Sequence, residues 1–291
     1  MTATELLSPV GAVPIPVVSP ARKDENRWLR AGRKVLGWTV SVAILLGTWW
    51  LFLIVFHIDH FIGKTPLDVW HFVTAKSTAA APMSSPTRGN LYPAARTTLR
   101  DAFVGLGAGT LAALVCSVVF NLRRSVEQTI MPIAMVLRSV PLVAMTPLIT
   151  LIFGRGLMCV TVIAGIVTFF PTLVNVTLAL RATPQASIDL FRAYGAGPFK
   201  TMRKAQFPNA LPAVFASLRI AAPLALVGAL LAEWLATGKG LGSLMLLSSP
   251  AGNYNMLWTS AVLITAFSMI LYTAISGVEK LVLARFGDVP T

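Results

Sequence analysis

Six long apolar runs constrain the fold of this chain more than any other feature of its sequence. They cover about residues 35–56, 102–120, 130–153, 157–180, 211–236 and 257–276. A helix needs about 20 residues to cross roughly 30 Å of hydrocarbon. Backbone groups in lipid must find hydrogen-bond partners within their own segment, so each run is expected to be helical. The runs therefore predict an all-α membrane protein with six transmembrane helices.

Composition supports this class. Only 12% of the residues are charged, against about a quarter in soluble domains. The net charge of +13 does not indicate nucleic-acid binding, because no basic face or base-stacking module accompanies it. Cys116 and Cys159 lie inside apolar runs and indicate no redox compartment.

The amino-terminal segment sets the expected orientation. A proline-rich stretch and a basic stretch fill residues 1–34 and predict a disordered tail. They do not form a cleavable signal, because the charges come late and the following apolar run is too long. With this tail inside, the inner connections carry roughly twice as many lysines and arginines as the outer ones, as the positive-inside tendency favours. We therefore expect both termini in the cytoplasm.

Several runs contain prolines that predict kinks. Pro132, Pro141 and Pro147 interrupt the third run, and Pro171 interrupts the fourth. Kinked helices are tolerated in membranes where neighbours or a cavity satisfy the freed carbonyl groups. This feature favours a protein with a pathway over a simple anchor.

A polar, basic segment separates the fourth and fifth runs. Thr183-Pro184 predicts a helix start, and Ile188, Phe191 and Tyr194 would share one side of that helix. Gly195 would end the helix in a left-handed conformation. Gly197-Pro198 predicts the start of a second short helix, which Pro208 would stop. Such a projection either docks in a partner's groove or lies on the membrane surface.

Five polar residues within or beside the runs are candidates for a translocation path. Arg138 and Arg219 lie roughly 12 Å inside the spans, where a charge needs a cavity, a partner or snorkelling. They would either attract an anion along a path or reach the inner headgroups. Glu233, near the outer end of the fifth run, would form an ion pair, a gate contact or a substrate contact. Ser139 and Asn175, like Thr146, would line a path or bond neighbouring helices.

Two other motifs carry less chemistry. The stretch "HIDH" at 57–60, even with His71, is an incomplete ligand set for a metal and is better explained as polar residues at the outer interface. Gly240-Leu241-Gly242 lacks the strand and helix of a phosphate-binding loop, so we interpret it as a turn.

The polar segment resembles the cytoplasmic EAA loop of permease subunits of bacterial ABC importers. That loop has Glu-Ala-Ala, three residues, Gly, nine residues, Ile, one residue and Leu-Pro. This chain has Asp189-Leu190-Phe191, then Gly195, Ala205 and Phe207-Pro208 at the same spacing. The glycine and the proline are retained, whereas Asp replaces Glu and other apolar residues replace the alanines, the isoleucine and the leucine.

Three further blocks are similar to the nitrate/sulfonate/taurine branch of these permeases. They are "LRSVPLVAMTPLITLIFGRG" at 137–156, "FFPTLVNVTLAL" at 169–180 and "LLAEWLATGKGLGSLM" at 230–245. The resemblance implies a type I importer permease fold with a coupling-helix loop. It implies this plan: a disordered cytoplasmic tail (1–34), a first transmembrane helix (35–56), an extracytoplasmic loop (57–96), a five-helix core (97–280) with the coupling loop at 181–210, and a cytoplasmic tail (281–291).

The resemblance also implies partners and a location. The partners would be two copies of an ATPase subunit, an extracytoplasmic binding protein, a second permease subunit with a homodimer favoured, and membrane lipid, but no nucleic acid. The chain would be a multi-pass protein of the bacterial inner membrane and not an enzyme. It has no phosphate-binding loop, so ATP and Mg would be bound by the ATPase. Coupling would fall to Asp189, Arg192, Ala193, Tyr194, Gly195, Ala196, Pro198, Phe207 and Pro208.

The implied cargo is a small anionic solute such as a sulfonate, taurine or nitrate. A self-sufficient secondary transporter or channel is the alternative, but it would need mid-membrane carboxylates and usually a repeated half. An intramembrane enzyme would need a convergent catalytic constellation. The sequence shows neither feature.

Overall fold

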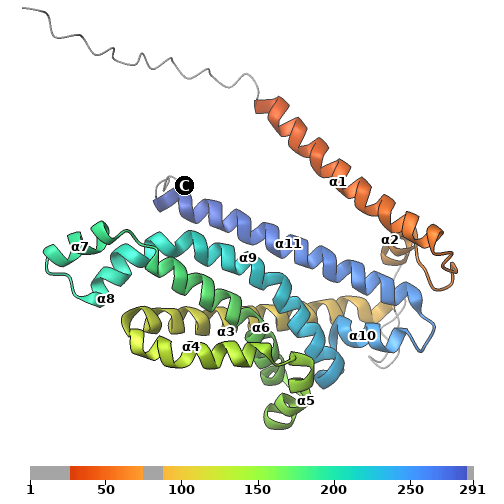
Figure 1. The fold of residues 1–291 in the computed structure, drawn as a ribbon. Coiled ribbons are helices and arrows are strands. Elements are labelled where there is room, and N and C mark those ends of the chain that lie inside the picture. Colours follow the sequence, from red (N-terminus) through yellow and green to blue (C-terminus); the bar gives the residue numbers. More distant parts are fainter. Residues whose placement is uncertain (1–26, 75–87, 287–291) are drawn as a thin grey trace, which may run out of the picture. The chain divides into compact units, whose positions relative to one another are not determined.

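The computed structural model describes residues 27–74 and 88–286, and every regular element in those ranges is helical (Figure 1). The chain divides into two compact units, Met1–Val55 and Phe56–Thr291. The first unit contains helix α1 (Arg27–Val55). Most of the tail expected over 1–34 lies outside the described residues. Residues 27–34 are helical, so the prediction of disorder is wrong for them.

The second unit holds the remaining elements, which alternate between long apolar helices and short connecting ones. They are α2 (Pro66–Thr74), η1 (Arg88–Asn90), α3 (Leu91–Leu122), α4 (Arg124–Ser139), α5 (Leu142–Phe153), α6 (Leu157–Arg181), α7 (Gln185–Ala193), α8 (Pro198–Thr201), η2 (Met202–Gln206), α9 (Phe207–Ala232), η3 (Glu233–Thr237), α10 (Gly240–Ser248) and α11 (Tyr254–Phe286). Helix α3 begins inside the range expected for the outer loop, and α11 continues past residue 280.

Within the described residues, five helices are long and apolar enough to cross a membrane, or six spans if α4 and α5 count as one. These two helices meet at an angle of 104°. The break falls at Val140, which is extended, and Pro141. A residue before proline is disfavoured in the α conformation, which explains the position of the break. The third apolar run is therefore a sharply bent pair of helices rather than one kinked span.

Small residues bring α3, α6 and α9 together in the core of the second unit. A Cβ atom at Gly105 would overlap the side chain of Ala164, and one at Gly109 would overlap the Thr168 hydroxyl. A Cβ atom at Gly228 on α9 would also overlap Ala164, at its Cα atom. Close backbone approach of this kind is typical of helix packing in membranes, where lipid tails are as apolar as leucine.

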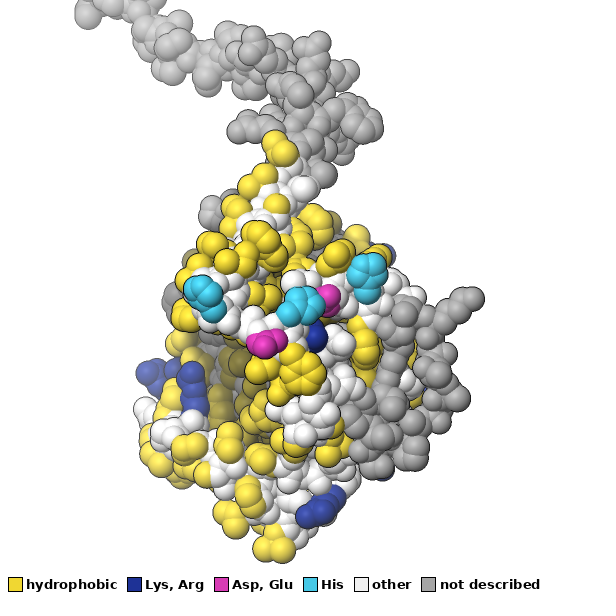
Figure 2. Space-filling model, turned by 90° about the vertical axis from the view of Figure 1, so that its right-hand side faces the viewer, with side chains coloured by type: hydrophobic (Ala, Val, Ile, Leu, Met, Phe, Trp, Pro, Cys, Tyr) yellow, Lys and Arg dark blue, Asp and Glu magenta, His cyan; other side chains and the backbone are white. Residues whose placement is uncertain are grey.

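The helices of the second unit place two kinds of connection at opposite ends (Figure 1). Helices α7 and α8 lie at the end that also holds the α3–α4 connection and the carboxyl end of α11. We call this the loop end. Helices α2 and α10 lie at the opposite end, which we call the far end. Figure 2 looks onto the far end, where apolar and uncharged surface predominates over charged side chains.

A capping box starts α2 at the far end. The Thr65 amide and hydroxyl both donate to the Asp68 carboxylate at 2.8 Å, and the Asp68 amide donates to the Thr65 hydroxyl at 3.2 Å. Burial alone would raise the pKa of Asp68, but these hydrogen bonds and the nearby charges of His60 and Lys64 together outweigh burial and hold the pKa below its ordinary value of 3.8. Pro66 follows the cap at the first helical position, where its missing N–H has no consequence.

Candidate functional site

Helix α7 projects from the loop end and terminates in a Schellman motif. The Ala196 amide donates to the Phe191 carbonyl at 2.9 Å, and the Gly195 amide donates to the Arg192 carbonyl at 2.9 Å. Gly195 has a φ of 71°, a value that favours glycine. The prediction that Gly195 ends this helix in a left-handed conformation is confirmed.

Two local details of this segment differ from expectation. The Thr183 hydroxyl does not cap α7; it donates to the Leu180 carbonyl and accepts from Asn209 on α9. Tyr194 lies beyond the last turn of α7 and is 83% exposed, whereas Ile188 and Phe191 are half-buried. Tyr194 therefore does not share their packed face.

Pro208 does not end the second helix. Helices α8, η2, α9 and η3 form one continuous span of 40 residues from Pro198 to Thr237. The element η2 is a π-helical turn in which the Phe207 amide bonds to the Met202 carbonyl. This wider turn precedes Pro208 and relieves the clash that proline normally causes with the carbonyl four residues before it.

Exposed apolar side chains gather on the projecting loop. Leu190, Tyr194 and Phe199 are all more than half exposed. Among the expected coupling residues, Asp189, Arg192, Ala193, Gly195 and Pro198 are also exposed, while Ala196, Phe207 and Pro208 are half-buried. Asp189 accepts hydrogen bonds from Gln185 at 3.0 Å and from Arg192 at 3.4 Å. The carboxylate thus serves to stiffen α7 along its exposed face.

The loop is attached to the bundle through polar contacts. The Asn121 amide at the end of α3 donates to the Gln206 side chain at 2.6 Å. Thr201 and Met202 are buried. A cavity of about 300 Å³ separates α7 from the ends of α3 and η2, and it is lined by residues that include Ile188, Arg192 and Gln206. A displacement of the loop would consequently be passed to α3 and α9.

The five candidate path residues do not converge on one site. Arg219 forms an ion pair with Glu279 on α11, with Nη1 and Oε2 2.6 Å apart. Arg138 and Ser139 are exposed at the end of α4, beside the bend, and the Ser139 hydroxyl bonds to its own helix. Asn175 is half-buried on α6. Thr146 is buried and bonds to the Leu142 carbonyl of its own helix.

Glu233 is fully buried, at the point where α9 passes into the π-helical turn η3. Its Oε2 atom accepts from the Gly242 amide at 2.7 Å, while Oε1 has no hydrogen-bond partner among the described residues. The Glu233 carboxylate also makes no ion pair in that part of the chain. It therefore holds the start of α10 through a backbone hydrogen bond rather than through a counter-charge.

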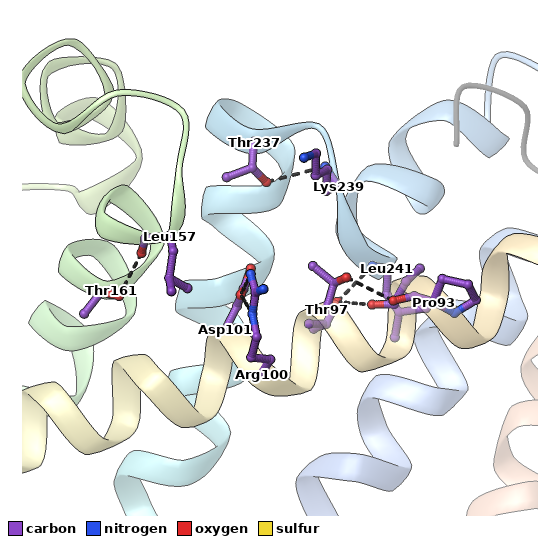
Figure 3. A network of polar contacts seen from close by, with 11 residues as sticks. Pro93, Thr97, Arg100, Asp101, Leu157, Thr161, Thr237, Lys239 and Leu241 are labelled. Carbon is purple, nitrogen blue, oxygen red and sulfur yellow. Dashed lines mark hydrogen bonds and ion pairs between the residues drawn. The ribbon is translucent and has the colours of Figure 1, made fainter. Parts of the chain in front are cut away.

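The glycines of the Gly240-Leu241-Gly242 stretch make room for this carboxyl group. A Cβ atom at Gly240 would overlap the Glu233 carboxyl, and one at Gly242 would lie 3.0 Å from its Oε2. The Leu241 amide between them donates to the Thr98 hydroxyl on α3 at 2.9 Å. Figure 3 shows this contact region, with Asp101 held by Arg100 nearby on α3. The stretch interpreted as a turn is thus the start of α10. Hydrogen bonds from Leu241 and Gly242 attach it to Thr98 on α3 and to Glu233 at the end of α9.

Sequence reasoning missed four partners in these contacts: Thr98, Asn121, Gln206 and Glu279. Asp101 is also 3% exposed despite its charge. Each partner lies far along the chain from the residue it contacts, so no local spacing pointed to it. Only Glu279 could have been suspected from the sequence, because a carboxylate six residues before Arg285 and near the end of an apolar run needs a partner.

The histidines of the far end form no metal centre. Within residues 27–74 and 88–286, no group of three or more His, Cys, Asp or Glu side chains is placed to hold a metal ion. The His60 Nε2 atom lies 3.6 Å from the Asp68 carboxylate. Figure 2 shows that the histidine side chains on this face are separated from one another.

The fold and the loop together define a multi-pass helical membrane protein with an exposed, firmly attached connection at one end. Comparison with protein families identifies the group. The model of the binding-protein-dependent transport system inner membrane component matches residues 105–287, more than half of the chain. The chain belongs to this family: it is a permease subunit of an ABC importer and not an enzyme. Membership implies ATPase subunits and a binding protein as partners.

Relatives by sequence carry several substrate names. A probable ABC transporter permease of Haemophilus influenzae is 30% identical over 64% of this chain and 76% of its own length. The riboflavin permease RibX of Chloroflexus aurantiacus is 30% identical, over 54% of this chain and 59% of its own. The sulfonate permease SsuC of Bacillus subtilis is 22% identical, over 75% and 76%.

A solved structure shares the fold. The inward-facing MetNI methionine ABC transporter matches 66% of this chain and 95% of its own chain, with a TM-score of 0.59 and 23% identity. This likeness confirms the all-α permease fold expected from the sequence.

Proposed function

We propose that α7, the Gly195 turn and α8 form the surface on which the partner ATPase docks and through which it moves the permease. One observation carries the proposal: Leu190, Tyr194 and Phe199 are exposed on a loop that a Schellman motif shapes and that the Asn121–Gln206 bond ties to α3. Exposed apolar side chains on a rigid support are the usual anchors of protein interfaces. ATP and Mg would be held by that partner.

The Tyr194→Ala and Phe199→Ala double variant tests this role. We expect it to retain the ATPase on co-purification at least about tenfold more weakly and to lose ATP-driven uptake, because the few aromatic anchors that dominate an interface each contribute about 2 kcal/mol or more. Tyr92→Ala is the matched control, since Tyr92 is 79% exposed on α3 at the far end. Normal uptake and normal ATPase retention in the double variant would refute the docking role.

For the cargo, we propose a small anionic solute such as a sulfonate, taurine or nitrate. The relatives named SsuC support this class, as does Arg138, which makes no ion pair within the described ranges and is exposed beside the α4–α5 bend. Arg219 no longer supports it, because Glu279 neutralises its charge. Reduced uptake of sulfonates by Arg138→Gln, with unchanged protein levels, is the expected result.

A nitrogen heterocycle is the second candidate cargo. The relatives named for riboflavin and formylaminopyrimidine are each 30% identical to this chain, and an uncharged ring would need no arginine in the path. Uptake of labelled riboflavin, formylaminopyrimidine, ethanesulfonate, taurine and nitrate should be measured in vesicles that hold the whole importer. Accumulation of a heterocycle alone would replace the anionic proposal.

We further propose a homodimer with both termini and the loop end in the cytoplasm. The excess of basic residues in the inner connections supports this orientation. A membrane-impermeant maleimide should label Lys239→Cys, at the far end, in intact cells and Lys200→Cys, on α8, only in opened cells. Labelling of Lys200→Cys from outside would invert the topology.

A further inference from the structure

A second cavity at the loop end, of about 400 Å³, lies between the start of α4 and the end of α6. Its charged part is formed by Arg124, Glu127 and Arg181. The Glu127 carboxylate is buried and forms an ion pair with Arg181. This pair joins α4 to α6 and leaves the Arg124 charge uncompensated, since Arg124 makes no ion pair in the described part of the chain.

The amino end of α4 also favours a negative group. Arg123 occupies the position before the helix and provides no side-chain cap. The first backbone amides of an α-helix lack intrahelical partners, and the helix dipole is positive at that end. Arg124 is exposed at this point and lines the cavity.

The other wall of the cavity is apolar. Met131, Pro132 and Met135 line it and lie roughly 10 to 16 Å along the helix axis from Arg124. Helices α4 and α5 together pass the length and hydropathy test for a membrane span. The cavity therefore runs from a basic site at the loop end toward the hydrocarbon layer.

We propose that this cavity binds one anionic phospholipid from the leaflet at the loop end. Its phosphate would lie against Arg124, and one acyl chain would follow Met131 and Met135. Basic pockets between transmembrane helices are suited to anionic headgroups. A free phosphate would leave the apolar wall unused. The proposal does not depend on which solute is carried.

The test uses the full-length chain purified in detergent and analysed by native mass spectrometry. Phosphatidylglycerol is titrated against phosphatidylethanolamine with the same acyl chains, and glycerol 3-phosphate is added as a competitor. We expect one phosphatidylglycerol to be retained preferentially. Arg124→Gln should weaken its retention about tenfold, the scale of one hydrogen bond to a charged group, and Arg124→Lys should restore most of it. Arg155→Gln, an exposed arginine between α5 and α6, is the control and should bind like the parent.

Three results would overturn the proposal. Equal retention of the two phospholipids would show that charge is not recognised. Displacement by glycerol 3-phosphate at the same concentration as lipid would show that the site takes a free phosphate. Unchanged lipid retention in Arg124→Gln, together with loss of the ATPase partner on co-purification, would assign the cavity to a protein contact. Because lipid retention is measured without transport, its failure leaves the docking role of α7 and α8 untouched.

Discussion

Arg219 on α9 and Glu279 on α11 form an ion pair whose Nη1 and Oε2 atoms are 2.6 Å apart, and both side chains are less than one third exposed. Arg219→Gln leaves Glu279 without its partner, so we expect the free energy of unfolding to fall by about 3 kcal/mol. The double variant Arg219→Leu, Glu279→Leu should unfold near the parent value. Detergent-induced unfolding of the parent, the single variant and the double variant measures both effects, and equal losses in the two variants would contradict a coupled pair.

The same double variant separates structure from transport. If the only role of Arg219 is to pair with Glu279, the double variant should import the cargo at close to the parental rate. A folded double variant that has lost uptake of anionic solutes would return Arg219 to the translocation path.

The contact between α3 and α6 predicts opposite effects for two neighbouring glycines. Gly109→Ala should destabilise the protein by about 1–3 kcal/mol, because its methyl group would overlap Thr168. Gly107→Ala should be neutral or stabilising by up to about 1 kcal/mol, since no atom lies within 4 Å of the added carbon. Unfolding in a detergent series compares the two, and a loss of equal size at Gly107 would show that α3 packs differently.

The close approach of Gly240 to the Glu233 carboxyl leaves no room for a methyl group at Gly240. Gly240→Ala should destabilise the far end by about 2–3 kcal/mol, because its φ of 91° strains the backbone and its methyl group would overlap the Glu233 carboxyl. Gly238→Ala is the control: its φ of 63° carries strain, but nothing lies within 4 Å. Adding Glu233→Ala to Gly240→Ala should restore the stability lost through the steric overlap. Thermal unfolding of the single and double variants measures this recovery. An additive loss would mean that the two residues do not touch.

The turn at Gly195 is constrained by its backbone and not by space. Gly195→Val should weaken coupling, because a β-branched residue at a φ of 71° costs about 1–2 kcal/mol. Gly195→Asn should be nearly normal, since asparagine tolerates this conformation. Uptake and the stimulation of ATP hydrolysis by cargo are the measurements. Equal behaviour of the two variants would remove the Schellman turn from the coupling mechanism.

The capping box of α2 predicts a dependence on acid. The pKa of Asp68 is lower in the folded chain than its ordinary value of 3.8, so ionised Asp68 stabilises α2 at all pH values above that. This stabilisation should disappear as the pH falls through 3.8 toward the folded pKa. Hydrogen exchange over residues 66–74, corrected for the intrinsic rate, should show α2 opening more easily at low pH. In Asp68→Asn the corrected rate should not vary with pH, and a parental profile in that variant would refute the assignment.

Features with a local physical cause were predictable from the sequence. The apolar runs at 157–180 and 257–276 lie within α6 and α11, because crossing hydrocarbon requires a minimum apolar length. The interruption at Pro141 and the left-handed residue at Gly195 follow from backbone restrictions on one or two residues. Pro208 was misjudged, since the π-helical turn before it absorbs a clash that an ordinary helix would not.

The amino-acid sequence by itself determined that this chain is a helical membrane protein, that its third apolar run is interrupted at Pro141 and that its loop turns at Gly195. Only the tertiary structure decided that Arg219 meets Glu279, that Leu241 meets Thr98 and that Asn121 meets Gln206, contacts that join residues 60, 143 and 85 positions apart. Hydrophobic length and backbone conformation act on neighbours in the chain. Ion pairs, carboxyl clasps and cavities depend on which helix faces approach, and that is settled when Gly105, Gly109 and Gly228 let the helices pack closely.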